Sequence, residues 1–509
     1  MHYEIDILLT DLRHTIADLG KDGGLITPAV YDTAQVLRWA PPVEGIWPAL
    51  DWLHAEQHAD GGWGDPATPR TRDLPTLAAV LAIHTHCSRR HSQEAVRRGV
   101  AFLARQACYW EGDLANDLTI GIEMLLPRLL EQAVEQGLAI DAAPYQHLFA
   151  LGKRRLELIQ KLRPGRGTTA LHSWEAWGSH ASAELIDNDG SVGSNLAATA
   201  CWLHCAGEHG ASAESRTAAQ DYIRRASLAT GLGIPGVVPS CWPFNRFEQV
   251  FSLHTLYLGN LLTLPQLATS LAPQLDALEH AFTPHGIGYN DCFTPDGDDT
   301  AASIAVLHRM GRRVDYTALQ HFAASDHFCA WPYELQPSVS VTAHAIDTLR
   351  LIGKDPTPYV GFLLKHQLAD GRWPGDKWNR SWLYTTWRVI AALARDYPEK
   401  LRQTAYTILA YQHRDGGWGI GGSSSEETAY ALLALRSLSR NAIRYDGMQE
   451  SIERADRWMI QNYRPLTHET MACWLSKEVY RPRRIAHVVE LTALLSKHPE
   501  LTEGREDPD

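Results

Sequence analysis

Apolar residues recur every three or four positions along most of the chain, and this spacing predicts α-helices. The pattern is clear in residues 74–86, 119–138, 195–207, 217–231 and 426–439. Alternating polar and apolar residues, which would indicate half-buried strands, are scarce. The expected fold class is therefore all-α.

A degenerate repeat punctuates these helical runs. It reads QHADGGWG from Gln57, QLADGRW from Gln367 and QHRDGGWG from Gln412. In each copy an apolar helical run ends at a glycine-containing turn, and the turn ends in a tryptophan that can pack back on the helices. Recurrence of one such unit is typical of stacked helical hairpins. The repeats therefore predict two toroidal α/α-barrels.

The length of the chain predicts two domains, because 509 residues exceed what one hydrophobic core usually supports. The repeats lie near the start and in the last third, and proline and glycine cluster at residues 233–244, 283–299 and 373–379. We expect one barrel to comprise residues 1–47 and 251–509. The other barrel, residues 48–250, would be inserted into it.

Composition and charge exclude several classes of protein. The formal net charge is −12 without a basic stripe to offset it, which argues against a nucleic-acid partner. No stretch reaches about 18 uninterrupted apolar residues, so no transmembrane segment is expected. The first residues are acidic and amphipathic, unlike a signal peptide. The 8 cysteines form no Cys-x-x-Cys pair, so a cytoplasmic protein with free thiols is the simplest interpretation.

Tryptophan is over-represented, with 17 residues against 10 phenylalanines. Its large electron-rich face can stabilise a cation, although most of these side chains are expected in the core. This excess matters only alongside a site that generates a cation.

The segment PDGDDTA, residues 295–301, is the strongest candidate for such a site, with Asp296, Asp298 and Asp299 in four positions. A solvated turn is one interpretation, because Pro-Asp-Gly is typical of turns. A divalent-metal site is a second, but no later glutamate completes an EF-hand pattern. An acid is the third: in a dry pocket, burial and like charge raise the pKa of a carboxyl and keep it protonated.

Several motifs together resemble one family. DGDDTA is similar to the Asp-x-Asp-Asp-Thr-Ala motif of class II terpene cyclases, and the repeats resemble the "QW" repeats of that superfamily, which includes squalene–hopene cyclase. Further segments resemble the family in its own order, namely residues 31–34, 122–133, 189–200, 375–386, 426–435 and 473–485. The length is that of bacterial diterpene cyclases of the copalyl diphosphate synthase type.

The resemblance implies a fold and a reaction. The fold would be the two-barrel βγ architecture without a class I α domain, because no Asp-Asp-x-x-Asp motif is present. The acid would protonate the terminal alkene of geranylgeranyl diphosphate, and ring closure would give a bicyclic labdane-type (copalyl) diphosphate. A class I terpene synthase would use the product next, and the enzyme could form a homodimer.

The resemblance also assigns the reacting residues. Asp298 would be the acid, and Asp296 and Asp299 would orient its proton. His172 matches the terminating base of plant enzymes, whereas Ser240 stands where those enzymes have a cooperating asparagine. A lone histidine on a helix is usually structural, so that alternative stays open.

Binding residues follow from the same comparison. Glu123 would hold Mg²⁺ near the diphosphate, unless it is a salt-bridged surface residue. The basic residues that match diphosphate-binding positions are Arg155, its neighbour Arg154, Lys377 and Lys477. The candidate aromatic wall comprises Trp174, Trp331, Tyr333, Trp382 and Tyr384, each of which could belong to the core instead.

Three alternatives remain from the sequence. The same chemistry on farnesyl diphosphate would give drimenyl diphosphate, and sequence does not reveal the depth of the cavity. A non-catalytic helical-toroid scaffold would be expected to have lost the acidic cluster, which is intact here. A zinc-containing prenyltransferase-like toroid would need a ligand set of Asp, Cys and His that the sequence does not show.

Overall fold

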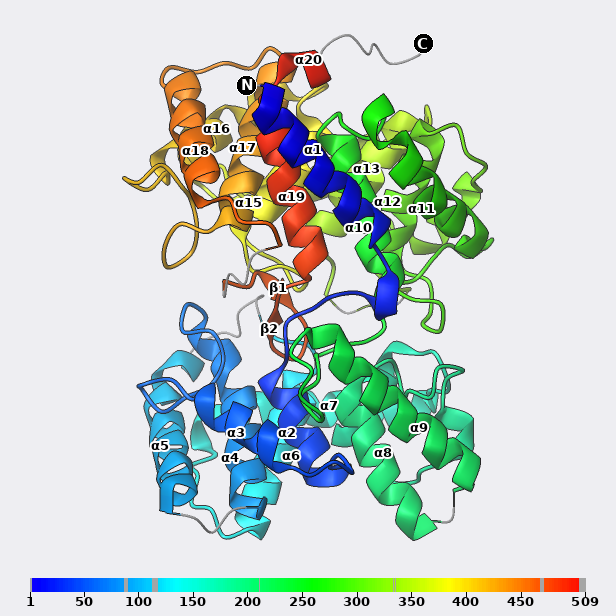
Figure 1. Ribbon diagram of the computed structural model, residues 1–509, viewed down its shortest axis with the longest axis vertical. Coiled ribbons are helices and arrows are strands. Elements are labelled where there is room, and N and C mark those ends of the chain that lie inside the picture. Colours follow the sequence, from blue (N-terminus) through cyan, green and yellow to red (C-terminus); the bar gives the residue numbers. More distant parts are fainter. Residues whose placement is uncertain are drawn as a thin grey trace.

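The computed structural model describes residues 2–86, 90–111, 118–209, 211–332, 334, 336–466 and 471–502. Its regular secondary structure is almost all helix, and it has two bodies, one above the other in Figure 1, joined at a narrow waist. The prediction of an all-α fold is confirmed. No helix in the described part of the chain is both long enough and apolar enough to cross a membrane.

The upper body is a closed double ring of helices. Its inner ring runs through neighbouring helices α10 (Asn245–Leu258), α12 (Gly297–Arg309), α13 (Val339–Leu351), α15 (Trp382–Leu393), α17 (Ser425–Arg440) and α19 (Arg483–Leu495), and α19 packs back on α10. The outer helices are α1 (His2–Ala17), α11 (Ala268–Ala281), α14 (Thr357–Lys365), α16 (Arg402–Ala410) and α18 (Met448–Asn462). A short helix, α20 (Pro499–Thr502), follows α19.

The lower body closes in the same way with fewer elements. Its inner ring consists of α2 (Val30–Trp39), α4 (Asp73–His86), α6 (Ile122–Glu135), the 3-10 helix η5 (Thr169–Ala176) and α8 (Leu196–His209). Outside it lie α3 (Trp47–Ala55), α5 (Arg90–Gln106), α7 (Gln146–Leu162) and α9 (Ala213–Ala226).

Short 3-10 helices occur in the connections of both bodies. Besides η5 they are η1 (Lys21–Gly23), η2 (Pro69–Arg72), η3 (Ala107–Trp110), η4 (Ala143–Tyr145), η6 (Ala183–Leu185), η7 (Ser227–Thr230), η8 (Pro265–Leu267), η9 (Tyr316–Phe322) and η10 (Pro398–Leu401).

The difference between inner and outer helices follows from their sequences. Inner helices are packed on all sides: α17 is buried from Ser425 to Leu438, so its side chains are mostly apolar or small. The outer helix α18 buries one stripe only, and charged residues such as Glu453 and Arg457 cover the rest.

The repeated turns hold consecutive hairpins together. In the first copy, Gln57 Nε2 donates to the backbone oxygens of Gly61 and Ala95, both at 2.9 Å, and Trp63 Nε1 donates to Leu53 O at 2.7 Å. The copies at Gln367 and Gln412 repeat the bond from glutamine to the turn, and Trp373 and Trp418 repeat the bond to the preceding helix. The repeat therefore has a structural role in building the barrels.

One predicted domain boundary needs correction. The sequence pattern assigns residues 1–47 to the larger barrel, whereas α2 lies in the lower body between α4 and α8. Val30, Ala34 and Leu37 are buried there in the lower core, because they form one apolar face of α2. The chain therefore crosses to the lower body before α2, and it returns to the upper body before α10.

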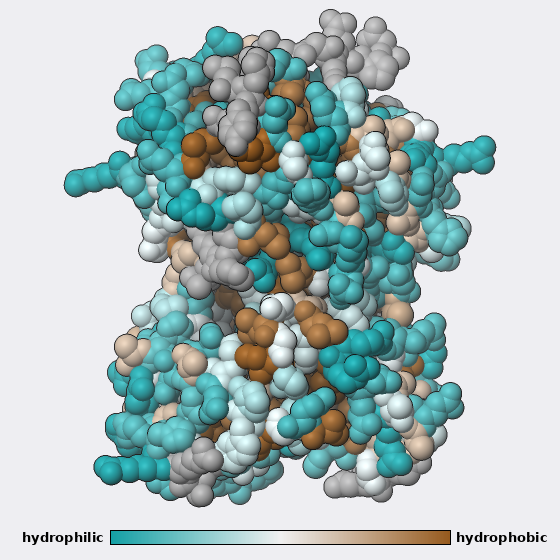
Figure 2. All heavy atoms as spheres, viewed as in Figure 1, coloured by the Kyte–Doolittle hydropathy of each residue, from teal (hydrophilic) through white to brown (hydrophobic). Residues whose placement is uncertain are grey.

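A small β-hairpin lies at the waist. Its strands β1 (Trp474–Leu475) and β2 (Val479–Tyr480) pair antiparallel, with Trp474 opposite Tyr480. On the face shown in Figure 2 the surface is mostly hydrophilic, and hydrophobic side chains gather around this waist. The two bodies therefore meet across a partly apolar junction.

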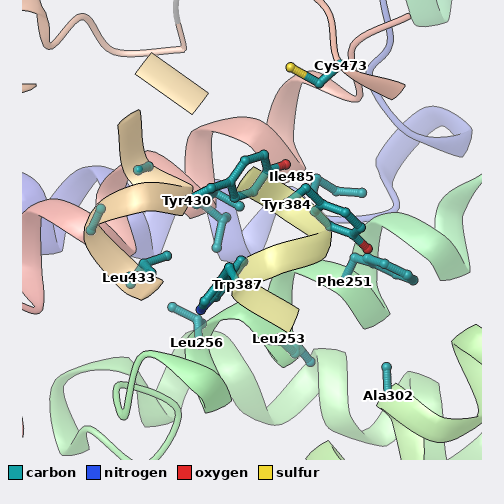
Figure 3. Close-up of a cluster of buried hydrophobic side chains, with 14 of the residues drawn as sticks. Phe251, Leu253, Leu256, Ala302, Tyr384, Trp387, Tyr430, Leu433, Cys473 and Ile485 are labelled. Atoms are coloured by element: carbon teal, nitrogen blue, oxygen red, sulfur yellow. The ribbon is translucent and has the colours of Figure 1, made fainter. Parts of the chain in front are cut away.

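The upper core is rich in aromatic side chains. Figure 3 shows Tyr384, Trp387 and Tyr430 packed among aliphatic residues, with the rings of Trp387 and Tyr430 stacked at 5.7 Å. Trp63, Trp174, Trp202, Trp373, Trp387 and Trp418 are all fully buried. These tryptophans are core residues, as expected for most members of that set.

Candidate active site

A cavity at the junction of the two bodies brings most of the candidate residues together. The upper body contributes the start of α12, the aromatic residues around α10 and the hairpin, and the lower body contributes Ile120, Thr169 and His172. The upper-body lining is Cys241, Phe244, Phe247, Phe251, Tyr289, Phe293, Asp296, Asp298, Asp299, Ala330, Trp331, Trp378, Trp474, Leu475, Ser476 and Tyr480. The three aspartates and His172 are therefore in one chamber.

The acidic cluster forms the first turn of α12. Asp296 is the N-cap residue, and its Oδ1 accepts hydrogen bonds from the backbone nitrogens of Asp298 and Asp299 at 3.0 and 2.8 Å. Glycine is required at position 297 because a Cβ there would lie 2.2 Å from Cys329 O. The cluster is thus a buried helix cap that packs against a neighbouring loop, and not the solvated turn that the sequence also allowed.

Asp296 and Asp299 form a carboxyl pair. Burial and the charge of Asp296 raise the pKa of Asp299 well above its usual value, and burial raises the pKa of Asp296 to about 7, opposed by its hydrogen bond to Asp299. Two buried carboxyls in contact retain a proton because both cannot ionise together. The stronger rise at Asp299 favours the proton on that carboxyl, with Asp296 as the hydrogen-bond acceptor.

Asp298 is separated from this pair and faces the cavity. Its side chain is 12% exposed, and its Oδ1 is in a short hydrogen bond with Nδ1 of His344. Burial, and after it the negative charge of Asp376, raise its pKa to about 7, whereas Arg388 and Lys377 oppose the shift. A substantial fraction of Asp298 is therefore protonated near neutral pH, and the carboxyl remains accessible from the cavity.

His344 is a site residue that sequence reasoning missed. It lies on α13, is 2% exposed, and burial holds its pKa well below the usual value, so the ring is neutral. Its ring meets Phe251 at 5.7 Å and His254 at 4.9 Å, both edge to face. The only available signal was a histidine in the otherwise apolar and small-residue run VSVTAHAI, which says nothing about its partner.

Asp376 is the second group that the sequence did not reveal. Its Oδ2 accepts from the hydroxyls of Ser338 and Ser340, both at 2.7 Å, and its Oδ1 accepts from Trp378 N at 3.0 Å. These donors hold the carboxyl group in place. Its charge raises the pKa of Asp298, so Asp376 is part of the site.

Aromatic faces form the wall beside the acid. Trp474 meets Phe247 at 5.3 Å and Phe251 at 5.7 Å, edge to face, and Trp474 Nε1 donates to Glu426 Oε1 at 2.9 Å. A second group contains Trp331, which meets Phe293 at 6.2 Å and Trp378 at 5.3 Å. Such faces attract cations without offering a nucleophile.

His172 lines the cavity from the lower body. Its Nδ1 lies 3.1 Å from Gly193 O, and its buried Nε2 has no hydrogen-bond partner among the described residues. With a proton on Nδ1 donated to that carbonyl, Nε2 is a free acceptor. Burial, followed by the charge of Lys477, lowers the pKa of His172 to about 3, so the ring is neutral.

Glu123 and Arg155 form an ion pair in the lower body. Glu123 lies in the first turn of α6, three residues after the cavity-lining Ile120, and its Oε1 lies 3.3 Å from Arg155 Nε. Both side chains remain partly exposed, and Arg155 Nε makes no hydrogen bond within the described chain. Arg154 is exposed on α7, so Arg155 is the better placed of the two.

Lys377 and Lys477 occupy different surroundings. Lys377 pairs with Glu334, donates to Gln336 O at 2.6 Å, and lies 5.0 Å from the ring of the cavity residue Trp378. Lys477 is fully buried between the two bodies and pairs with Glu175. The prediction that Lys477 binds the diphosphate is therefore wrong, because its ammonium group is enclosed by protein.

Several predicted wall residues lie behind the cavity rather than in it. Trp174 is in a lower-body core, Trp382 packs 5.4 Å from Tyr411, and Tyr384 packs 5.1 Å from Trp474. Ser240 is fully buried, and its backbone oxygen accepts from Asn195 Nδ2 at 2.9 Å, while the next residue, Cys241, lines the cavity. Tyr333 lies outside the described residues.

No metal-binding cluster of three or more His, Cys, Asp or Glu side chains occurs in the described part of the chain. A site of the zinc prenyltransferase kind therefore has no support there. Mg²⁺ bound through substrate phosphates needs fewer protein ligands, usually one or two carboxylates. Glu123 beside Arg155 fits that requirement.

Comparison with known proteins gives the family. Residues 334–443 match the squalene-hopene cyclase C-terminal domain. The chain is 44% identical to a (+)-kolavenyl diphosphate synthase of Herpetosiphon aurantiacus, over 97% of this chain and 98% of the relative. It is 29% identical to an ent-copalyl diphosphate synthase of a Streptomyces species, over 95% and 94% of the two chains.

The fold agrees with this relationship. The structure of ent-copalyl diphosphate synthase from Streptomyces platensis superposes with a TM-score of 0.78 at 27% identity, covering 97% of this chain and 99% of that one. With its double barrel and its acid at the junction, this protein belongs to the bacterial class II diterpene cyclases. It is an enzyme, so the scaffold alternative is excluded.

Proposed function

We propose that the enzyme protonates the terminal alkene of geranylgeranyl diphosphate and closes two rings, giving a bicyclic labdane-type (copalyl) diphosphate. The single observation that carries this proposal is Asp298, a carboxyl with a pKa of about 7 facing an aromatic cavity. The names of the two relatives described above, a kolavenyl and an ent-copalyl diphosphate synthase, support the C20 substrate.

The first step transfers the Asp298 proton to the alkene carbon that carries hydrogen. An alkene is a very weak base, so this step needs a dry site and an acid held against it. The carbocation forms at the terminal tertiary carbon. Asp298 becomes a carboxylate, and His344 stabilises it with a hydrogen bond from Nδ1–H to Oδ1.

Ring closure follows within the aromatic chamber. Each internal alkene attacks the cation in turn, and the folded substrate geometry decides which stereoisomer forms. The faces of Phe247, Phe251 and Trp474 stabilise the passing charge and exclude water. No bond to the diphosphate breaks.

The last step removes a proton from the bicyclic cation. His172 is a suitable base because it is neutral and its Nε2 is free inside the cavity. A carbocation is so acidic that a weak base suffices. The proton later returns to solvent, and Asp298 is protonated again, so the net reaction is an isomerisation.

Glu123 would hold Mg²⁺, and Arg155 and Lys377 would bind the diphosphate. The metal would neutralise phosphate charge without entering the chemistry at the alkene. Arg155 can pair with two phosphate oxygens through its planar guanidinium, whereas Lys377 supplies a point charge. Both would exchange a carboxylate partner, Glu123 or Glu334, for phosphate.

A second candidate product is kolavenyl diphosphate, the product named for the relative at 44% identity. The third candidate product is drimenyl diphosphate, which would form if farnesyl diphosphate were the substrate. One assay separates them. Purified protein with Mg²⁺ is given the C20 or the C15 substrate, and the dephosphorylated products are compared with copalol, kolavenol and drimenol standards by gas chromatography–mass spectrometry.

Copalol from the C20 substrate would establish the proposal. Detection of kolavenol would leave the proposed acid and substrate in place, but the fate of the bicyclic cation would have to be revised. Turnover of the C15 substrate alone would replace the proposed substrate. Absence of any cyclic product would overturn the proposal.

A further inference from the structure

The tip of the β-hairpin, residues 476–478, is inserted from the upper body into the lower one. Ser476 O accepts from Ile120 N at 2.8 Å. The carboxylate of Glu478 accepts from Val30 N at 2.8 Å and from Tyr31 N at 2.9 Å, and so binds the N-terminus of α2. These contacts link segments that are far apart in the sequence, and they join the two bodies at the tip of the hairpin.

Lys477 lies at the centre of this insertion. Its ammonium group is in a short ion pair with Glu175 and donates to Asn195 Oδ1 at 2.6 Å. Tyr31 closes the site, with its hydroxyl donating to Glu175 Oε1 at 2.9 Å and its ring 5.5 Å from the ammonium nitrogen. Lys477 is fully buried and does not line the cavity, so phosphate cannot reach it.

The pair connects two parts of the catalytic cavity. Trp474, Leu475, Ser476 and Tyr480 of the same hairpin line the upper wall. Glu175 belongs to η5, three residues after His172, which lines the lower wall. The Lys477–Glu175 pair therefore joins the hairpin that carries part of the aromatic wall to the segment that carries His172.

The charge of Lys477 adds a second effect. After burial, it is the next cause that lowers the pKa of His172, so the ring is neutral before the reaction and able to accept a proton. Glu175 lies against the ammonium group and offsets part of its charge.

We propose that Lys477 is a positioning residue for the end of the reaction, holding the hairpin wall and His172 so that one proton is removed from the cyclised cation. The proposal rests on the function proposed above. It replaces the predicted role of Lys477 in binding diphosphate. When the pair is lost, the cation should be deprotonated elsewhere or captured by water, so the product mixture should broaden.

The test compares Lys477→Met with wild type and with Lys400→Met, an exposed lysine as control. Products are quantified by gas chromatography–mass spectrometry after dephosphorylation, and KM and kcat are measured with the C20 substrate. We expect the ratio of minor to major products to rise about tenfold, because small barrier differences separate competing exits from one cation. KM should stay within about threefold of wild type, since no diphosphate contact is lost.

Two results would overturn the proposal. A KM raised tenfold or more with an unchanged product ratio would return Lys477 to the diphosphate site. A lower kcat and melting temperature with an unchanged product ratio would leave it a purely structural role.

Removing one partner of a buried ion pair can prevent folding. If Lys477→Met does not fold, Glu175→Gln provides the measurement, because it keeps the shape of the side chain and removes the charge. An unchanged product ratio in folded Glu175→Gln would contradict the proposal. A wild-type enzyme that yields no cyclic product would instead refute the proposed function, so the two failures are distinguishable.

Discussion

Asp298 and His344 form a buried hydrogen bond between α12 and α13, with Oδ1 of the acid against Nδ1 of the ring. The bond leaves the other carboxyl oxygen of Asp298 for the cavity. Because the imidazole can donate to the carboxylate, it would stabilise Asp298 after loss of a proton. In the proposed mechanism the contact between α12 and α13 thus supports the first chemical step.

Replacement of His344 should slow initiation without weakening substrate binding. For His344→Ala we expect kcat to fall about 10- to 100-fold, as for loss of one hydrogen bond to a charged group. KM should be little changed. His321→Ala, at an exposed position, is the control. A His344→Ala enzyme with wild-type kcat would show that the bond has no part in catalysis.

The pH dependence of kcat/KM should report the acid. Burial and Asp376 raise the pKa of Asp298 to about 7, and only the protonated form can donate. The rate should therefore be constant below pH 7 and fall as pH rises through this value, approaching about tenfold per unit. Measurement from pH 5.5 to 9 tests this. A rate that climbs with pH across that interval would identify a base, not an acid, as the controlling group.

Removal of Asp376 should move that profile. In Asp376→Asn the nearby negative charge is lost, so the pKa of Asp298 should fall and the decline should begin at lower pH. The amide oxygen can still accept from Ser338 and Ser340, whereas the bond from Trp378 N to the other oxygen is lost. An unmoved midpoint would mean that Asp376 does not set the acidity of Asp298.

Substitution of His172 should change the product rather than stop the reaction. With His172→Ala we expect substrate consumption within about tenfold of wild type, because protonation at Asp298 is untouched. The major product should give way to other double-bond isomers or to hydroxylated compounds. His204→Ala, in the lower body outside this cavity, is the control. Wild-type products from His172→Ala would assign the final proton to another group.

Glu123 should govern the response to Mg²⁺. Glu123→Gln keeps the size of the side chain but removes the charge that would hold the ion. The Mg²⁺ concentration for half-maximal rate should rise about tenfold, the usual cost of losing a group that supports a metal site. Glu131→Gln, on the same helix, serves for comparison. Identical Mg²⁺ titrations of Glu123→Gln and wild type would remove Glu123 from the metal site.

The sequence predicted those features that depend on local spacing. The glutamine–tryptophan repeats predicted the helical hairpins because the turn and its two hydrogen bonds lie within a few residues of each other. The cap formed by Asp296 is also a local feature, because its two backbone donors, Asp298 N and Asp299 N, follow within three positions. The position of α2 was not, because its apolar face fits either barrel and only packing decides between them.

Long-range partners could not be inferred from the sequence. His344 lies 46 positions from Asp298, and Glu175 lies 302 positions from Lys477. From the sequence alone Lys477 is a candidate diphosphate ligand, and only the fold shows that it is buried and already paired with Glu175. Tyr384 and Trp474 illustrate the same limit: both are aromatic, and only the packing places Trp474 in the wall and Tyr384 behind it.

Incorporation of deuterium from solvent tests the central claim most directly. If Asp298 delivers a proton to the terminal alkene, the reaction in D₂O should place one deuterium per product molecule at the carbon that was the terminal alkene CH. The diphosphate should remain attached, and Asp298→Asn should lose about 10²- to 10⁴-fold in rate. Asp276→Asn, at an exposed ion pair, should react like wild type. Cyclic product without deuterium, or undiminished cyclisation by Asp298→Asn, would contradict the account.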